Sequence, residues 1–225
     1  MPETPDLDTL LDAALAHVVF DGWSEATFSA AATDAGLTLA DAKALAPRGV
    51  LDLAIAFHRR GDRAMVEALE KADLSSLRYS ERVAKALQLR IEVMTDREAV
   101  RRATTLFSLP TNAPEGAKLV WETADHIWHT LGDTSDDGNW YSKRATLSAV
   151  WASVVLYWLG DDSPGFQRTY EFIDRRIENV MQIEKMKGQL RANPLTKPLM
   201  DLQDTFLSRM HPPKVPVDVP GRWNP

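Results

Sequence analysis

The chain has 225 residues, 44% of them hydrophobic, which excludes an intrinsically disordered protein and provides enough apolar side chains for one or two packed domains. Its 26 basic residues stand against 32 acidic ones, a formal charge of -6, and this balance disfavours nucleic-acid binding because Lys and Arg make most phosphate contacts. Cysteine is absent, which excludes disulfides, thiolate zinc sites, iron–sulfur clusters and thiol nucleophiles and is consistent with a reducing compartment.

The first residues of the chain contain neither the basic and apolar regions of a signal peptide nor an Arg-rich transit segment, so we expect neither here. The most apolar stretch, residues 145–159, is interrupted by Thr and Ser alone. A helix of this length rises about 22 Å, less than the roughly 30 Å hydrocarbon core of a bilayer. We therefore expect a buried central helix, and membrane contact that is only peripheral.

Apolar residues recur at helical spacing along most of the chain, and no segment alternates as a strand does. Thr38 with Asp41 has the spacing of a capping box, and Ser163 before Pro164 that of a helix start. The pattern predicts an all-α fold of about ten helices, over residues 7–18, 27–35, 38–47, 50–72, 83–94, 97–108, 116–131, 140–159, 163–181 and 195–210.

Three short segments near the N-terminus are residues 10–15 (LLDAAL), 21–23 (DGW) and 35–38 (AGLT). In this order they resemble the start of a TetR-type regulator, which joins a helix-turn-helix head to an all-α ligand domain. Residues 39–45, at the position of the recognition helix, lack the aromatic and basic residues expected there, and residues 24–49 hold three acids against two bases. We expect residues 1–49 to form a degenerate head that binds no nucleic acid, with a ligand-responsive transcription regulator as the alternative function.

The end of the chain differs in composition from the body, residues 50–187. Residues 188–194 are polar and include a glycine, so we expect a linker that leads to a helix over residues 195–211. The apolar residues of this helix fall within an arc of about 80° and are predicted to bind a membrane surface: Leu195, Leu199, Leu202, Phe206 and Met210. Docking on the chain's own body, or on a second subunit in a homodimer, is the alternative. Residues 212–225 are Pro-rich, which favours an extended tail.

Four motifs in the second half of the chain occur in a distinctive order. They are Asp-His-Ile-Trp-His at residues 125–129, Gly-Asp-Thr-Ser-Asp at 132–136, Asn-Trp-Tyr-Ser-Lys-Arg at 139–144 and Asp-Arg-Arg-Ile-Glu at 174–178. Together they resemble the ninth Coq protein family of ubiquinone biosynthesis, which is TetR-like in fold. The likeness runs from about residue 7 to residue 186 and is strongest over residues 125–181.

This resemblance implies a function. Members of that family are non-catalytic accessory proteins that bind an isoprenoid or quinone lipid instead of DNA. They present the quinone intermediate from the membrane to the di-iron demethoxyubiquinone hydroxylase, and their last helix is amphipathic and binds the membrane. For this chain the resemblance implies no cofactor and a peripheral place on the cytoplasmic side of a bacterial inner membrane, or on the mitochondrial matrix side if the chain is a processed eukaryotic form.

Two groups of residues are candidates for binding. The first consists of large apolar side chains on the central helices, which the resemblance assigns to lipid although such a stripe also forms an ordinary core: Trp121, Trp128, Leu147, Trp151, Val154, Phe172 and Met181. The second lies around the polar loop and the helix start after it, where exposed aromatic residues favour a contact with the partner hydroxylase: Asp133, Asn139, Trp140, Tyr141 and Arg144. The alternative for the two aromatic residues is that they cap the core.

A metal enzyme is the third hypothesis. The candidate ligands include two i,i+4 pairs on one helix and two acids on another: Glu122, Asp125, His126, His129, Asp174 and Glu178. A ferritin-like di-iron centre needs two Glu-x-x-His motifs, and the sequence contains none. Structural hydrogen bonds beside the polar loop are the simpler interpretation, so we expect no metal site and no catalytic residue.

Overall fold

The computed structural model describes residues 6–135 and 138–192. Within these ranges lie nine α-helices, one short 3-10 helix and no strand, so the predicted all-α class is confirmed. The elements are α1 (Leu7–Asp21), α2 (Glu25–Asp34), α3 (Leu39–Leu45), α4 (Val50–Lys71), α5 (Tyr79–Glu92), α6 (Arg97–Ser108), α7 (Ala113–Thr130), α8 (Gly138–Gly160), η1 (Pro164–Phe166) and α9 (Gln167–Ala192).

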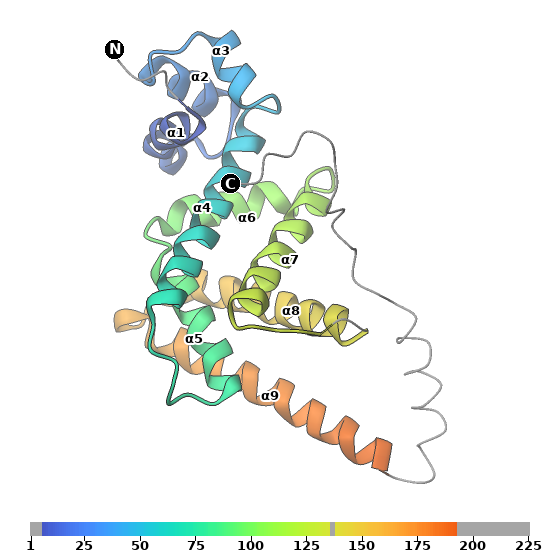
Figure 1. The fold of residues 1–225 in the computed structure, drawn as a ribbon. Helices are drawn as coiled ribbons and strands as arrows, with labels where there is room; N and C mark the ends of the chain where they lie inside the picture. The colour runs from blue at the N-terminus through green and yellow to red at the C-terminus, as the bar shows by residue number, and fades with distance from the viewer. Residues whose placement is uncertain (1–5, 136–137, 193–225) are drawn as a thin grey trace.

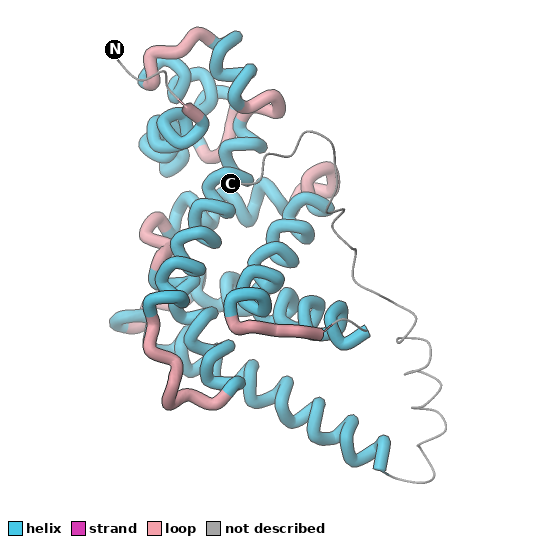
Figure 2. The backbone as a smooth tube through the Cα atoms, viewed as in Figure 1, coloured by secondary structure: helices cyan, strands magenta, loops and turns pink. Residues whose placement is uncertain are grey.

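Side-chain caps explain where several helices begin. Asp6, Ser24 and Asp96 each accept a hydrogen bond from the backbone N–H three residues later, at the starts of α1, α2 and α6. Thr38 accepts from the N–H of Asp41 at 3.1 Å, which confirms that this residue opens α3. Each such cap stabilises its helix by about 1 kcal/mol. Local sequence therefore sets the breaks between the helices, which are joined by loops in Figure 2.

The first three helices form a head with its own apolar core. Leu10 and Ala14 of α1 pack there with Phe28 of α2, and all three side chains are fully buried. The first turns of α4 join the same core through Leu53. In Figure 1, α4 then continues away from the head and into the rest of the molecule. This helix therefore connects the head to the body.

The remaining helices form a body around a second core. Trp151 and Trp158 of α8 are the largest side chains in it, and each is 1% exposed. α8 packs against both α7 and α9, and α5 packs against α4 and α9. The apolar stretch at residues 145–159 is thus the buried central helix that the sequence predicted. Figure 1 shows α9 at the lower edge of this body.

The start of α7 differs from the sequence prediction. The helix begins at Ala113, three residues before the predicted start at Gly116. Pro114 lies in its first turn, where a backbone N–H has no partner within the helix and the missing donor is not needed. Pro114 is therefore compatible with the first turn of α7, and the helix starts earlier than its apolar spacing predicted.

The end of α9 also differs. The helix continues to Ala192, so residues 188–192, which we expected to belong to a linker, are helical. A single glycine such as Gly188 costs a helix interior only about 1 kcal/mol, which is too little to end a helix of this length. Residues 193–194, the predicted membrane helix 195–211 and the Pro-rich tail 212–225 lie outside the described residues.

Candidate functional site

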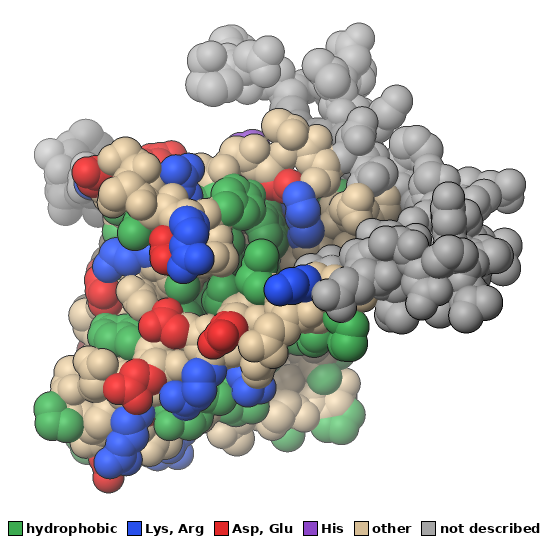
Figure 3. All heavy atoms as spheres, turned by 90° about the horizontal axis from the view of Figure 1, so that it is seen from below, with side chains coloured by type: hydrophobic (Ala, Val, Ile, Leu, Met, Phe, Trp, Pro, Cys, Tyr) green, Lys and Arg blue, Asp and Glu red, His purple; other side chains and the backbone are tan. Residues whose placement is uncertain are grey.

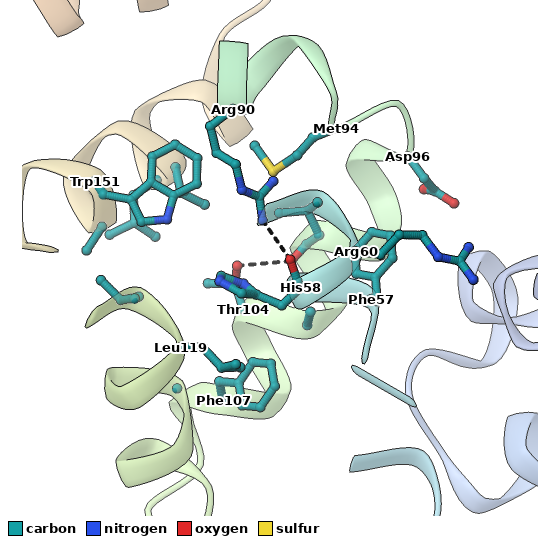
Figure 4. Close-up of a pocket in the computed structure, with 18 of the residues that line it drawn as sticks. Phe57, His58, Arg60, Arg90, Met94, Asp96, Thr104, Phe107, Leu119 and Trp151 are labelled. Atoms are coloured by element: carbon teal, nitrogen blue, oxygen red, sulfur yellow. Dashed lines mark hydrogen bonds between the residues drawn. The ribbon is translucent and has the colours of Figure 1, made fainter. Parts of the chain in front are cut away.

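A cavity of about 430 Å³ lies among α4, α5, α6, α7 and α8. Its wall is mainly apolar, and Phe57, Met94, Phe107 and Trp151 are among the larger side chains around it (Figure 4). Ligand cavities in proteins commonly measure about 300–1,000 Å³, so this one has the size of a small-molecule site. It is larger than the second cavity of the body, which measures about 250 Å³, and is the first candidate for ligand binding.

Leu156 of α8 marks where this cavity meets the surface. Its side chain lines the cavity and is nevertheless 62% exposed. Ala113 and Ala117, in the first two turns of α7, also line the cavity and are exposed. Apolar side chains thus border the exposed part of the cavity, which suits the entry of an apolar molecule.

One side of the cavity is polar. Arg90 of α5 donates from Nε to Asp62 of α4 at 2.8 Å, and both side chains are buried. Thr123 of α7 donates to the same carboxylate at 3.0 Å, and His58 Nε2 lies 2.9 Å from the Thr123 hydroxyl. Burial raises the pKa of Asp62, but hydrogen bonds and charge from His58 and Arg90 outweigh burial and hold the pKa below its ordinary value. The carboxylate is therefore ionised at neutral pH, and one buried network joins α4, α5 and α7.

A second cavity, of about 250 Å³, is lined by residues of α5, α7, α8 and α9. Tyr79 and Trp128 line it and stack on each other, with ring centroids 5.9 Å apart. The ammonium group of Lys143 lies 5.5 Å from the centre of the Trp128 ring, a distance at which a cation is attracted to the ring face. Aromatic rings and a lysine ammonium group therefore meet at the wall of this smaller cavity.

The side chains that the sequence offered for lipid binding lie in several places. Trp151 lines the larger cavity, whereas Trp128, Leu147 and Met181 line the smaller one. Helical spacing places all of these residues inside the body. It does not determine which of two neighbouring cavities each one faces, because that depends on how the helices cross.

Three of the proposed lipid residues line neither of these two cavities. Val154 is fully buried in the body core. Phe172 stacks on Tyr157, with ring centroids 4.3 Å apart. Trp121 is half-buried and contacts the aromatic rings that open α8. Their packing accounts for these side chains without a ligand.

Most of the larger cavity's wall was not found from the sequence. The missed residues include Phe57, His58, Arg90, Met94 and Phe107. A signal was available in α5, where Arg90 falls between the apolar positions Leu87 and Ile91. A charged residue inside an apolar stripe is costly to bury without a partner, and therefore indicates a buried ion pair.

Trp121, Trp140 and Tyr141 form a cluster that we call the aromatic patch. The rings of Trp140 and Tyr141 meet edge to face at 4.8 Å, and Trp121 of α7 lies 5.9 Å from Trp140. The three side chains are half-buried, so each ring contacts the protein with one part and solvent with another. Neither Trp140 nor Tyr141 is enclosed in the core.

The charged residues predicted beside the aromatic patch are buried. Arg144 lies 4.0 Å from the centre of the Trp140 ring and donates to Asp125 at 2.5 Å and to Asp133 at 3.2 Å. Burial raises the pKa of Asp133, but hydrogen bonds from Lys143 and other donors outweigh burial and lower it. The side chains of Asp133 and Arg144 are only 3% and 4% exposed, so they position the loop and Trp140, while Asn139 is exposed at the start of α8.

The candidate metal ligands do not come together. Glu122 accepts two hydrogen bonds from Arg59 at 3.0 Å, and Asp125 is paired with Arg144. Both His126 and His129 are exposed on α7. Asp174 and Glu178 are exposed on α9, and no group of three His, Cys, Asp or Glu side chains within residues 6–135 and 138–192 could hold a metal ion.

The head holds little free positive charge for a DNA backbone. Arg48, one of the two basic residues over residues 24–49, donates to Asp52 at 2.7 Å and to Glu115 of α7 at 3.1 Å. These ion pairs tie the head to the body and neutralise the guanidinium. DNA binding would require several phosphates to be neutralised, so the transcription regulator has little electrostatic support.

The helices of the structure bear on how the protein could meet a membrane. No helix in the described part of the chain is both long and apolar enough to span a membrane. Seen from below, acidic and basic side chains lie close together with apolar groups between them (Figure 3). Electrostatic attraction to an anionic membrane would therefore be weak on this face.

Comparisons with known proteins match the chain to one family. The model of the COQ9 family matches residues 113–184, which include α7, α8, the three residues of the aromatic patch and most of α9. Human mitochondrial ubiquinone biosynthesis protein COQ9 is 28% identical over 191 residues, which are 81% of this chain and 60% of the human protein. COQ9-B of Xenopus laevis is 32% identical over 191 residues, 81% of this chain and 65% of the frog protein. The chain thus spans about three-fifths of the length of the curated relatives it matches.

Among solved structures, a TetR transcriptional regulator from Nitrosomonas europaea matches with a TM-score of 0.63. The match covers 76% of this chain and 95% of the regulator, at 17% sequence identity. This likeness concerns the fold, since so low an identity does not carry function. The chain is therefore similar to the COQ9 family over about four-fifths of its length, and its fold is TetR-like.

Proposed function

We propose that this protein is a non-catalytic accessory protein of ubiquinone biosynthesis that binds an isoprenoid quinone intermediate in the larger cavity. The observation that carries the proposal is the cavity itself: about 430 Å³, mainly apolar, and open to the surface beside Leu156. Relatives named as ubiquinone biosynthesis proteins support the pathway. A long isoprenoid tail exceeds a cavity of this size, so the tail would leave it past Leu156.

Presentation to the di-iron demethoxyubiquinone hydroxylase needs a docking surface. The aromatic patch supports this role, because Trp and Tyr are the residues most often found at the energetic centre of protein interfaces. Arg144 and Asp133 hold Trp140 in place from beneath, which reduces the conformational entropy that binding would cost. Trp140 and Tyr141, with exposed Asn139 beside them, are therefore the residues we propose to contact the hydroxylase.

The membrane completes the proposal. The predicted helix over residues 195–211 carries its apolar residues on one narrow stripe and would lie in the membrane interface. It follows α9 in the chain, and Met181 of α9 lines the smaller cavity. With this helix the protein would rest on the inner membrane from the cytoplasmic side, or from the matrix side in a mitochondrion, as the resemblance to the family implies.

A cavity-filling variant tests lipid binding. Ala152 lines the larger cavity, whereas Ala149, one turn earlier on α8, is exposed. We expect lipid to be extracted by organic solvent from the purified wild-type protein and from Ala149→Trp, and to be identified by mass spectrometry. Ala152→Trp should lose most of it, because the indole occupies the ligand's volume. Absence of lipid from the wild-type protein, or equal lipid in both variants, would contradict the proposal.

A further inference from the structure

We propose that Arg90 binds an oxygen atom of the ligand through its free Nη1, so that the larger cavity selects a neutral amphiphile with an oxygen-bearing head group. This inference rests on the function proposed above and specifies the chemistry of the ligand. The cavity would then discriminate against a pure hydrocarbon, which offers no acceptor, and against an anionic lipid.

The hydrogen bonds of Arg90 leave one nitrogen without a partner. Its side chain is 2% exposed and lines the cavity. Nε donates to Asp62 at 2.8 Å, and Nη2 donates to the backbone carbonyl of His58 at 3.0 Å. Nη1 is buried and has no hydrogen-bond partner among the described residues. Leaving a charged donor unsatisfied away from water is costly, so an acceptor inside the cavity would bind it with a clear gain in free energy.

The guanidinium is held in place from two sides. On one side lies Gly61 of α4, where an added Cβ would lie only 2.5 Å from Nη1. On the other side the Arg90 guanidinium carbon lies 5.4 Å from the centre of the Trp151 ring, with Met94 nearby (Figure 4). Because Gly61 has no side chain, the guanidinium of Arg90 can approach the backbone of α4. The free donor is fixed before the ligand arrives, which lowers the entropic cost of binding.

The charges around the cavity favour a neutral head group. The positive charge of Arg90 is already balanced by the buried carboxylate of Asp62. His58 Nε2 lies 2.9 Å from the Thr123 hydroxyl and 3.4 Å from the Asp62 carboxylate, and Thr123 donates to Asp62, so these side chains already have partners within the network. An anion at Nη1 would have to share a buried guanidinium whose charge the Asp62 carboxylate already balances, which disfavours it.

The other charged residues of the cavity wall have partners elsewhere. Arg60 is paired with Asp8 at 3.0 Å and Asp12 at 2.5 Å, both of α1. Asp96 caps α6 by accepting from the N–H of Ala99 at 2.8 Å. Among the charged residues of the described cavity wall, Arg90 thus keeps a free donor, Nη1, and a carbonyl or hydroxyl oxygen of a quinone or phenol matches it. The rest of such a molecule would contact the apolar wall.

Three probes with the same decyl tail test the selectivity: decylbenzoquinone, decylbenzene and decyl phosphate. Calorimetric titration of the full chain, stripped of lipid on a hydrophobic resin, should give decylbenzoquinone an affinity at least about tenfold higher than either other probe, as expected for one hydrogen bond to a charged donor. Equal affinities for the quinone and decylbenzene would overturn the role of Arg90 but leave the proposed function intact. Tightest binding of decyl phosphate would overturn the neutral head group. Failure of all three probes would contradict the proposed function as well.

Two variants test the residue. Gly61→Ala should displace the guanidinium and abolish the tenfold preference of the protein for decylbenzoquinone over decylbenzene. Gly160→Ala is the matched control, since an added Cβ there meets no atom within 4 Å and the preference should persist. If Gly61→Ala lowers the melting temperature too far for titration, the double variant Arg90→Gln with Asp62→Asn removes both charges together and should show the same loss. A preference that survives in a folded variant of either kind would refute the proposal.

Discussion

Asp161, between α8 and α9, provides a prediction whose size can be worked out from the structure. Its carboxylate is buried and accepts hydrogen bonds from the backbone N–H of Ser163 at 2.9 Å and of Thr169 at 2.9 Å, and from the Thr169 hydroxyl at 2.6 Å. Burial raises the pKa of Asp161, but these bonds outweigh burial and lower it from 3.8 to about 2. The residue therefore fastens the start of α9, and with it the wall of the smaller cavity, to the end of α8.

Replacement by Asn removes this stabilisation at neutral pH. At about 1.4 kcal/mol per pKa unit, the lowered pKa of Asp161 corresponds to roughly 2 kcal/mol. Because the folded-state pKa is the lower one, this contribution is complete above pH 4 and is lost as the pH falls toward 2. The amide nitrogen of Asn would also face a backbone N–H. We expect Asp161→Asn to lower the free energy of unfolding by about 2 kcal/mol at pH 7 and by much less near pH 2.

Urea denaturation followed by circular dichroism at several pH values measures this difference. Asp162→Asn is the control, because the Asp162 side chain is 88% exposed and pairs with exposed Arg168 at 3.2 Å. An exposed pair of this kind contributes little, so the control should change the free energy of unfolding by less than about 0.5 kcal/mol. Equal effects of the two substitutions, or a loss for Asp161→Asn that does not shrink in acid, would refute the reasoning.

The fold could be predicted because its signals are local. Thr38 and Asp41 lie three residues apart, and the apolar residues that bury α8 follow each other within a few turns. Such spacing specifies a helix and its inward face regardless of what packs against it. The errors fell at Pro114 and Gly188, residues that are compatible with a helix at their positions and that only the surrounding structure can place.

The candidate site could be predicted only in part, because a cavity is defined by residues far apart in the sequence. On α8, Val154 packs into the core while Val155 faces the larger cavity, and no local pattern separates the two. Asp62 and Arg90 are 28 residues apart on different helices, so neither predicts the other. The crossing of α4, α5 and α7 brings them together, and it also creates the unsatisfied nitrogen at the polar end of the cavity.

The remaining predictions concern the partner and the membrane. Trp140→Ala with Tyr141→Ala should weaken hydroxylase binding by about 2 kcal/mol or more in calorimetry, while circular dichroism stays unchanged, and unfolding of this variant would assign the two rings to the core. Phe206→Glu should prevent flotation with liposomes, since full burial of a Phe contributes on the order of 1.5–3 kcal/mol and a charge on the apolar stripe removes it. Thr205→Glu adds the same charge to the polar side of the predicted helix and should leave flotation intact. The binding should also be insensitive to salt, because the charges of this helix nearly cancel. If Phe206→Glu lowers the melting temperature of the whole protein instead, Phe206 packs against the body or a second subunit, and the membrane role of this helix is wrong.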